Sequence, residues 1–110
     1  MVRRFGQVLG IKPEFVEEYS RHHAKLWPEI ASALHEAGLR NYSIFQHRGQ
    51  LFGYFEYIGP PEEYAQRMQA LARAPRMREW WDLMEPMQIP DAARAPGEWW
   101  STMNEVFHLD

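Results

Sequence analysis

The stretch LRNYSIFQHRGQLFGYFEYI, residues 39–58, predicts two antiparallel strands joined by a short turn. The turn is Arg48-Gly49-Gln50, because a glycine between two runs of apolar and aromatic residues is typical of a β-hairpin. Tyr42 and Ile44 share one face of the first strand, and both strands carry apolar residues on both faces. A sheet that is buried on both faces predicts helices on one side and another layer, such as a second subunit, on the other side.

The residues before this hairpin predict a helix in two pieces. Pro13 suits the first turn of a helix, and the apolar and aromatic residues that follow it recur at helical spacing. Pro28 has no backbone N–H, so the first piece should break or kink near Trp27. The second piece then runs to Gly38, which is a typical stop at the C-terminal end of a helix.

The residues after the hairpin repeat this arrangement. Pro61 opens a further helix, Ala74-Pro75 interrupts it, and residues 77–84 continue it. Residues 86–97 contain three prolines and predict a loop.

Strands are expected at both ends of the chain. Alternation over residues 2–11 predicts the first strand, and residues 99–109, with the apolar pair Val106 and Phe107, predict the last. The order strand, helix, strand, strand, helix, strand predicts an α+β, ferredoxin-like βαββαβ fold with an antiparallel sheet and helices on one face. We expect one domain over residues 1–110.

Composition excludes several classes of function. The chain has 25% charged residues, a net charge of −3 and no cysteine, which excludes disulfides, thiolate nucleophiles and cysteine-type zinc sites. Basic and aromatic residues do not interleave, so we expect no nucleic-acid partner. The N-terminus lacks an apolar signal core and no apolar run is long enough to span a bilayer, so we expect a cytoplasmic location and no membrane partner.

Residues 18–29 carry the best candidate for chemistry. A helix brings residues four apart onto one face, so Tyr19, His23 and Trp27 should form one stripe. An imidazole titrates near pH ~6.5 and can give or take a proton at neutral pH. A lone histidine is more often a surface or structural group, and both interpretations stay open on the residues alone.

The other candidates are weaker. Tyr42 fits core packing and ligand contact equally well. Adjacent helical residues diverge by about 100°, so Trp80 and Trp81 should not share one contact direction. Either one lies in the core and the other at a pocket, or both are structural aromatics, which the residues alone favour. Glu18 and His22 lie four apart, but the helix offers no third ligand beside them, and we expect no metal site.

These segments together resemble the L-rhamnose mutarotase family. The resemblance covers nearly the whole chain, and the matching residues in sequence order are Glu18-Tyr19, Arg21, His23, Trp27-Pro28-Glu29, Asn41-Tyr42-Ser43-Ile44, Arg78-Glu79-Trp80-Trp81, Met84 and Glu105-Val106-Phe107-His108-Leu109.

This resemblance implies a fold, a reaction and a site. The fold would be of the dimeric α+β barrel type and the protein a cytoplasmic homodimer. The reaction would interconvert the α and β anomers of L-rhamnopyranose by acid/base ring opening and closure, without cofactor or metal. His23 matches the proton donor, which we expect to protonate the ring oxygen, and the sugar-binding positions are Tyr19, Tyr42, Trp80 and Trp81. The complementary base is not identified; a water held by Tyr19 or Tyr42 is one candidate.

Some positions depart from the family pattern. His22 replaces the usual arginine, Gln88-Ile89-Pro90-Asp91 replaces an Asn-Pro-Asp-like segment, and Trp99-Trp100 is bulky. If this loop covers the pocket, another 6-deoxy pyranose such as L-fucose is an alternative substrate. A cofactor-free monooxygenase or a small-ligand-binding protein of the same fold is the rival from a different class.

Overall fold

A curled antiparallel sheet forms one layer of the protein, and the computed structural model describes it over residues 2–110. Met1, the first residue of the expected domain, lies outside the described residues. The strands run in the order β2-β3-β1-β4, and β5 pairs with the same edge of β1 as β4. Their bounds are β1 (Arg3–Ile11), β2 (Leu39–His47), β3 (Gln50–Tyr57), β4 (Gln88–Ile89) and β5 (Ser101–Met103).

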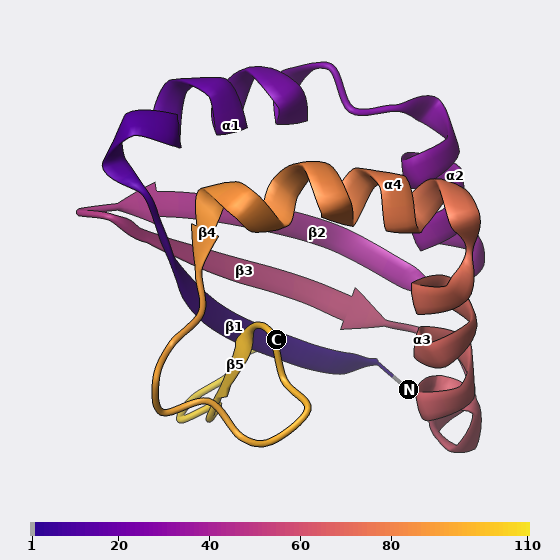
Figure 1. Ribbon diagram of the computed structural model, residues 1–110. Coiled ribbons are helices and arrows are strands. Elements are labelled where there is room, and N and C mark those ends of the chain that lie inside the picture. The colour runs from indigo at the N-terminus through magenta and orange to yellow at the C-terminus, as the bar shows by residue number, and fades with distance from the viewer. Residues whose placement is uncertain (1) are drawn as a thin grey trace.

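The helices form the second layer, on one face of this sheet (Figure 1). They are α1 (Val16–Ala24), α2 (Pro28–Glu36), α3 (Tyr64–Arg73) and α4 (Pro75–Met84), with single 3₁₀ turns at Pro13–Phe15, Pro61–Glu63 and Glu85–Met87. The predicted α+β, ferredoxin-like fold with helices on one face is therefore confirmed. Among residues 2–110, no helix combines the length and the apolar character needed to cross a membrane.

The core lies between the two layers. Leu9, Ile11 and Leu51 of the sheet and Ile30 of α2 expose at most 2% of their surfaces. Burying each such side chain contributes roughly 1.5–3 kcal/mol, so this core holds the helices against the sheet.

The hairpin forms at the predicted position and explains the placement of Tyr42. Arg48 and Gly49 have φ values of 50° and 78°, as a two-residue type I′ turn requires. The ladder between β2 and β3 shifts between Arg40 and Ser43, where Asn41 adopts φ 52°. A one-residue shift reverses which face each later side chain occupies. The bulge therefore turns Tyr42 to the helix side of the sheet, where it lines the cavity described below.

The expected stripe on the first helix is wrong at its third member. Helix α1 ends at Ala24, and Trp27 lies beyond it in extended conformation, with ψ 131°. The cause is Pro28, which disfavours helical geometry at the residue before it. The indole of Trp27 packs edge-on against Trp80 and under the guanidinium of Arg76, at 5.1 and 3.8 Å.

The last strand is shorter than predicted. Residues 101–103 pair with β1, and the Arg4–Glu105 ion pair at 3.0 Å continues this register along the side chains. In the same register Val106 would face Arg3, the first residue of β1, and Phe107 would lie beyond the strand; neither pairs with β1, and they expose 94% and 77% of their surfaces. The expected loop over residues 86–97 also contains the two-residue strand β4.

Candidate active site

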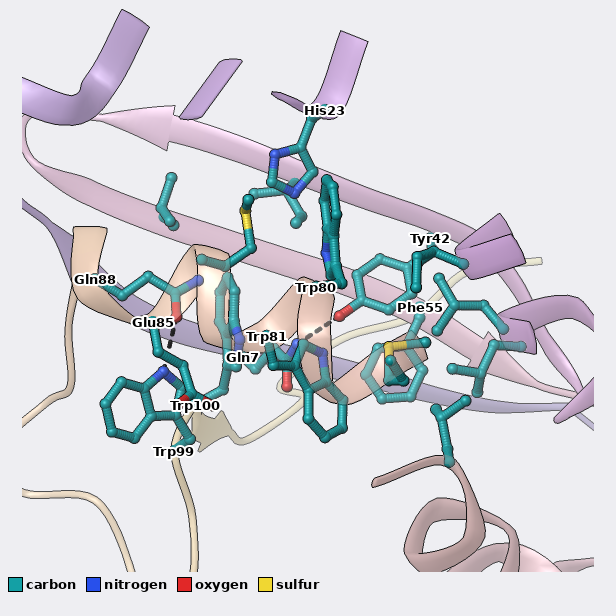
Figure 2. Close-up of a pocket in the computed structure, with 18 of the residues that line it drawn as sticks. Gln7, His23, Tyr42, Phe55, Trp80, Trp81, Glu85, Gln88, Trp99 and Trp100 are labelled. Atoms are coloured by element: carbon teal, nitrogen blue, oxygen red, sulfur yellow. Dashed lines mark hydrogen bonds between the residues drawn. The ribbon is translucent and has the colours of Figure 1, made fainter. Parts of the chain in front are cut away.

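A cavity of about 760 Å³ lies between the helices and the sheet. Its size is in the range of small-molecule sites. The polar and aromatic side chains that line it, several of which Figure 2 labels, include Gln7, Tyr19, His23, Tyr42, Tyr64, Trp80, Trp81, Glu85, Gln88, Trp99, Trp100 and Thr102. All five residues expected at a sugar site, His23, Tyr19, Tyr42, Trp80 and Trp81, are in this set, and Trp27 is not.

His23 extends from α1 toward the cavity and beside Trp80, whose ring centroid is 5.3 Å away (Figure 2). Its Nδ1 lies 2.9 Å from the carbonyl oxygen of Tyr19. A carbonyl only accepts, so Nδ1 carries the hydrogen. Burial lowers the pKa of His23 below 6.5, which leaves the ring neutral at pH 7 with a lone pair on Nε2. Proton donation by His23 therefore has to follow an earlier proton uptake.

Tyr19 lies one turn before His23, and the two rings are 4.4 Å apart. The residue exposes 5% of its surface, and burial raises the pKa of its phenol to about 12. Gln88 Nε2 donates a hydrogen bond to the Tyr19 hydroxyl at 3.0 Å, and Trp99 Nε1 donates to Gln88 Oε1 at 2.7 Å. Tyr19 is therefore a neutral phenol at the end of a chain of three side chains.

Tyr42 enters the cavity from β2 and has a similar partner. Gln7 Nε2 of β1 donates to its hydroxyl at 3.2 Å (Figure 2). Burial raises the pKa of Tyr42 to about 12, although the residue exposes 37% of its surface. The two observations agree because surface that faces an open cavity counts as exposed.

Trp80 and Trp81 both line the cavity from α4 (Figure 2). Trp80 exposes 5% of its surface and belongs to the core, whereas Trp81 is half-buried. The divergence of adjacent helical residues thus divides their surroundings, as expected, but it does not remove either indole from the cavity.

Sequence reasoning did not assign Gln7, Gln88, Trp99 or Trp100 to the site. Gln88, Trp99 and Trp100 come from the segment whose departure from the family pattern is visible in the sequence, and this segment does border the cavity. For Gln7, the sequence predicts a place on an alternating strand but no role in the site. Within residues 2–110, no three His, Cys, Asp or Glu side chains gather as a metal ion requires.

This arrangement suits a small, hydroxylated ligand. His23 Nε2 offers a basic acceptor, the two phenols offer hydroxyls that are neutral at pH 7, and indole rings offer flat apolar surfaces. The site holds groups for proton transfer; the chain has no cysteine, and Ser20, which also lines the cavity, bonds the carbonyl of Val16 and not a histidine.

Comparison with known proteins agrees with a site for a small, hydroxylated ligand. The family model described as L-rhamnose mutarotase matches residues 4–109. The curated L-rhamnose mutarotase of Lactiplantibacillus plantarum is 38% identical over 109 residues, which cover 97% of this chain and 98% of the relative. That of Ligilactobacillus salivarius is 35% identical over the full length of both chains.

Solved structures support the fold. L-rhamnose mutarotase from Formosa agariphila superposes with a TM-score of 0.76 at 24% identity, covering 98% of this chain and 99% of that one. Tetracenomycin F2 cyclase from Streptomyces glaucescens, a type-II polyketide cyclase, gives 0.75 at 16% identity, covering 98% of this chain and 97% of that one. Because one fold carries these two activities, the fold alone does not fix the reaction. The match of the family model over residues 4–109 does identify the family: this chain belongs to the L-rhamnose mutarotase family, a family of carbohydrate isomerases.

Proposed function

We propose that this protein interconverts the α and β anomers of L-rhamnopyranose, with His23 as the residue that transfers the proton of the anomeric hydroxyl. The observation that carries the proposal is a neutral imidazole, fixed through Nδ1 and beside the phenol of Tyr19, on a cavity that Tyr42 also lines and that is large enough for a monosaccharide. Membership of the family supplies the choice of reaction.

The tautomer of His23 sets the order of events. Nε2 accepts the proton of the anomeric hydroxyl, the bond between C1 and the ring oxygen breaks, and C1 becomes an aldehyde carbon. A second group gives the ring oxygen a proton at the same time. After rotation about the C1–C2 bond the ring closes on the other face: the second group takes the proton back from the attacking hydroxyl, and the imidazolium gives its proton to the aldehyde oxygen, which becomes the new anomeric hydroxyl. This proposal replaces the expectation that His23 protonates the ring oxygen: here His23 donates its proton only in ring closure, to the oxygen on C1.

The sugar-binding roles fall to Tyr19, Tyr42, Trp80 and Trp81. Phenol hydroxyls bond sugar oxygens, and the indoles pack against the C–H face of the ring. The proposed reaction uses no cofactor or metal, because acid/base catalysis by a positioned side chain contributes about 10²–10⁴-fold.

The segment over the cavity favours one second candidate. Gln88, Trp99 and Trp100 line the same space as His23. These side chains differ from the family pattern, so another 6-deoxy pyranose such as L-fucose is the alternative substrate.

We also propose a cytoplasmic homodimer. The face of the sheet opposite the helices carries Phe45, which exposes 65% of its surface, and Met103, and the exposed Val106 and Phe107 follow β5. Apolar surface of this kind marks protein contacts more often than free surface, and a second copy of the chain is the proposed partner. Sedimentation velocity that gives only the mass of one chain would contradict this.

Saturation-transfer NMR tests the reaction. The H1 signal of one L-rhamnose anomer is saturated with and without protein, and loss of intensity at the other anomer measures exchange. We expect faster exchange for L-rhamnose than for L-fucose, L-lyxose or D-ribose. Faster exchange of L-fucose would select the alternative substrate. Binding without acceleration, or oxygen uptake with an aromatic substrate, would replace the mutarotase proposal by one of its rivals.

A further inference from the structure

We propose that Gln88, held by Trp99, is a positioning residue that fixes Tyr19 as the proton donor to the ring oxygen of the sugar. This inference rests on the proposed mutarotase function and adds the second group that the reaction requires.

The direction of each hydrogen bond follows from the indole. Trp99 Nε1 can only donate, so the atom of Gln88 that faces it at 2.7 Å must be the oxygen Oε1. The amide group is planar, so its nitrogen Nε2 faces the Tyr19 hydroxyl at 3.0 Å and donates to it. The order Trp99 to Gln88 to Tyr19 is therefore one-directional.

The consequence for Tyr19 is that its oxygen accepts from Gln88 and its own hydrogen points elsewhere. Tyr19 lines the cavity, and it keeps that hydrogen at neutral pH because its pKa is about 12. A phenol that is bonded in this way offers a donor, not an acceptor, to a ligand. Next to it, His23 Nε2 is an acceptor, and the two rings lie 4.4 Å apart.

The burial of Gln88 indicates that these hydrogen bonds are part of the site. Among residues 2–110, and apart from buried tyrosines, Gln88 is the one polar or charged residue that is buried, with 7% of its surface exposed. Burying an amide is unfavourable unless its groups are hydrogen-bonded, and here both are. An apolar side chain would fill the same space, so the amide is needed for what it bonds.

A sugar has the matching pair of groups on one carbon. The anomeric hydroxyl, which donates to His23 Nε2, and the ring oxygen, which accepts from Tyr19, are both bonded to C1. In ring opening, Nε2 gains the hydroxyl proton, the C1–ring oxygen bond breaks, a C1=O bond forms and Tyr19 gives its proton to the ring oxygen. Ring closure reverses both transfers, so no net proton is gained or lost.

Tyr42 provides an internal contrast. Its partner Gln7 is not bonded to an indole among residues 2–110, so the Gln7 amide can rotate by half a turn and present either atom. Tyr42 can therefore donate or accept, as a binding group for several hydroxyls requires. The Tyr19 oxygen already accepts from Gln88, so its hydrogen is the group left for a ligand.

The test compares Gln88→Glu with Gln88→Met, Trp99→Phe and Tyr19→Phe in the full chain. In Gln88→Glu the carboxylate accepts from both neighbours, which draws the Tyr19 hydrogen away from the cavity. A neutral carboxyl, formed at low pH, restores the original direction, because its O–H donates to Tyr19. We therefore expect the ratio of wild-type to Gln88→Glu kcat on L-rhamnose to increase about tenfold or more from pH 5 to pH 8.

The other variants fix the size of the effect. Tyr19→Phe should lower kcat about 10²-fold, since general acid catalysis is lost. Gln88→Met should lower kcat about tenfold and Trp99→Phe about threefold, with smaller changes in KM. Thermal unfolding of each variant identifies loss of folded protein, and Gln69→Glu, an exposed position on α3, controls for the added charge.

The outcomes separate this inference from the function on which it rests. A ratio that does not change with pH, or full kcat in a folded Gln88→Met, would overturn the inference while the wild-type exchange keeps the mutarotase proposal. A wild-type protein that accelerates exchange of no sugar would remove the function, and the inference with it.

Discussion

The cavity has two walls that are built in different ways. The helical wall consists of Tyr19 and His23 on α1 and Trp80 and Trp81 on α4. The loop wall consists of Gln88, Trp99 and Trp100, which come from a segment interrupted by Pro90 and Pro96. In the first wall, helical spacing places the side chains within each helix, and the contact of His23 with Trp80 joins the two helices.

The loop wall is held by contacts within the loop and by the distant bond between Gln88 and Tyr19. Glu98 stabilises it, because its carboxylate accepts hydrogen bonds from the backbone N–H of Ala95 at 3.2 Å and from the hydroxyl of Thr102 at 2.6 Å. The Thr102 bond in particular lowers the pKa of Glu98. We propose that the helical wall carries the groups that transfer protons, and that the loop wall positions Tyr19 through Gln88 and selects the sugar through Trp100.

The largest expected effect is on the helical wall. His23→Ala should lower kcat for L-rhamnose about 10²–10⁴-fold, because the group that takes the anomeric proton is lost. His22→Ala is the matched control, since His22 is bonded to Glu18 at 3.4 Å and does not line the cavity. Saturation transfer on both variants measures the rates. Equal rates for the two would assign the proton transfer to another residue.

The two indoles of the helical wall should separate stability from binding. Trp80→Ala removes a core side chain and should lower the free energy of unfolding by about 3–5 kcal/mol. Trp81→Ala should cost less stability and increase KM about tenfold, as the loss of roughly 50 Å² of apolar contact implies. Urea unfolding and the dependence of exchange on sugar concentration measure the two quantities. The reverse pattern would place the sugar against Trp80.

The sequence predicts the helical wall well because its information is local. The spacing of Tyr19 and His23 and the prolines that begin and end helices act within a few residues. The alternating strands and the glycine turn at Gly49 likewise give the order of the elements. Trp27 is the exception, and there the effect of Pro28 on its neighbour overrides the helical spacing.

The loop wall was harder to predict because no local pattern defines it. Gln88 contacts Tyr19 across 69 positions in the chain. The bulge at Asn41 that turns Tyr42 toward the cavity has no marker in an otherwise regular alternation. Strand β5 ends at Met103, opposite Gly6, and the apolar residues Val106 and Phe107 do not reveal that the pairing stops before them.

The pH dependence of exchange tests the protonation state of His23. Because burial lowers its pKa, Nε2 is free near pH 7, and kcat/KM should fall about tenfold per pH unit once the pH is below that pKa, which lies under 6.5. Stability should change in the same direction. The unfolded chain binds more protons at this histidine below pH 6.5, so the free energy of unfolding falls as the pH falls. Exchange that increases toward pH 5 would show that the protonated ring is the active form.

A smaller effect is expected from the loop wall. Trp100→Ala enlarges the cavity at the side away from His23 and should change the ratio of kcat/KM for L-rhamnose and L-fucose by about tenfold, a difference that one pocket contact commonly gives. The kcat of the preferred sugar should change much less, since His23 and Tyr19 stay in place. Equal losses for both sugars would mean that Trp100 supports the fold and not the choice of substrate.

The smallest expected effect tests the hydrogen bond between Gln7 and Tyr42 on the sheet. Gly53 pairs with Gln7 across β3 and β1, and a Cβ at Gly53 would lie 3.0 Å from Gln7 Cγ and 3.4 Å from the Trp100 ring. Gly53→Ala should therefore displace Gln7, lengthen its bond to Tyr42 and increase KM about threefold, as a loss of about 0.7 kcal/mol implies.

Gly6→Ala is the matched control for this substitution. It adds the same methyl group on the opposite face of the sheet, where the nearest atom is the flexible end of Met103 at 3.2 Å. Its KM should equal that of the wild type, while both variants lose similar stability from the change in a strand. If Gly6→Ala and Gly53→Ala shift KM equally, the Gln7–Tyr42 bond has no part in holding the sugar, and Tyr42 binds without support from the sheet.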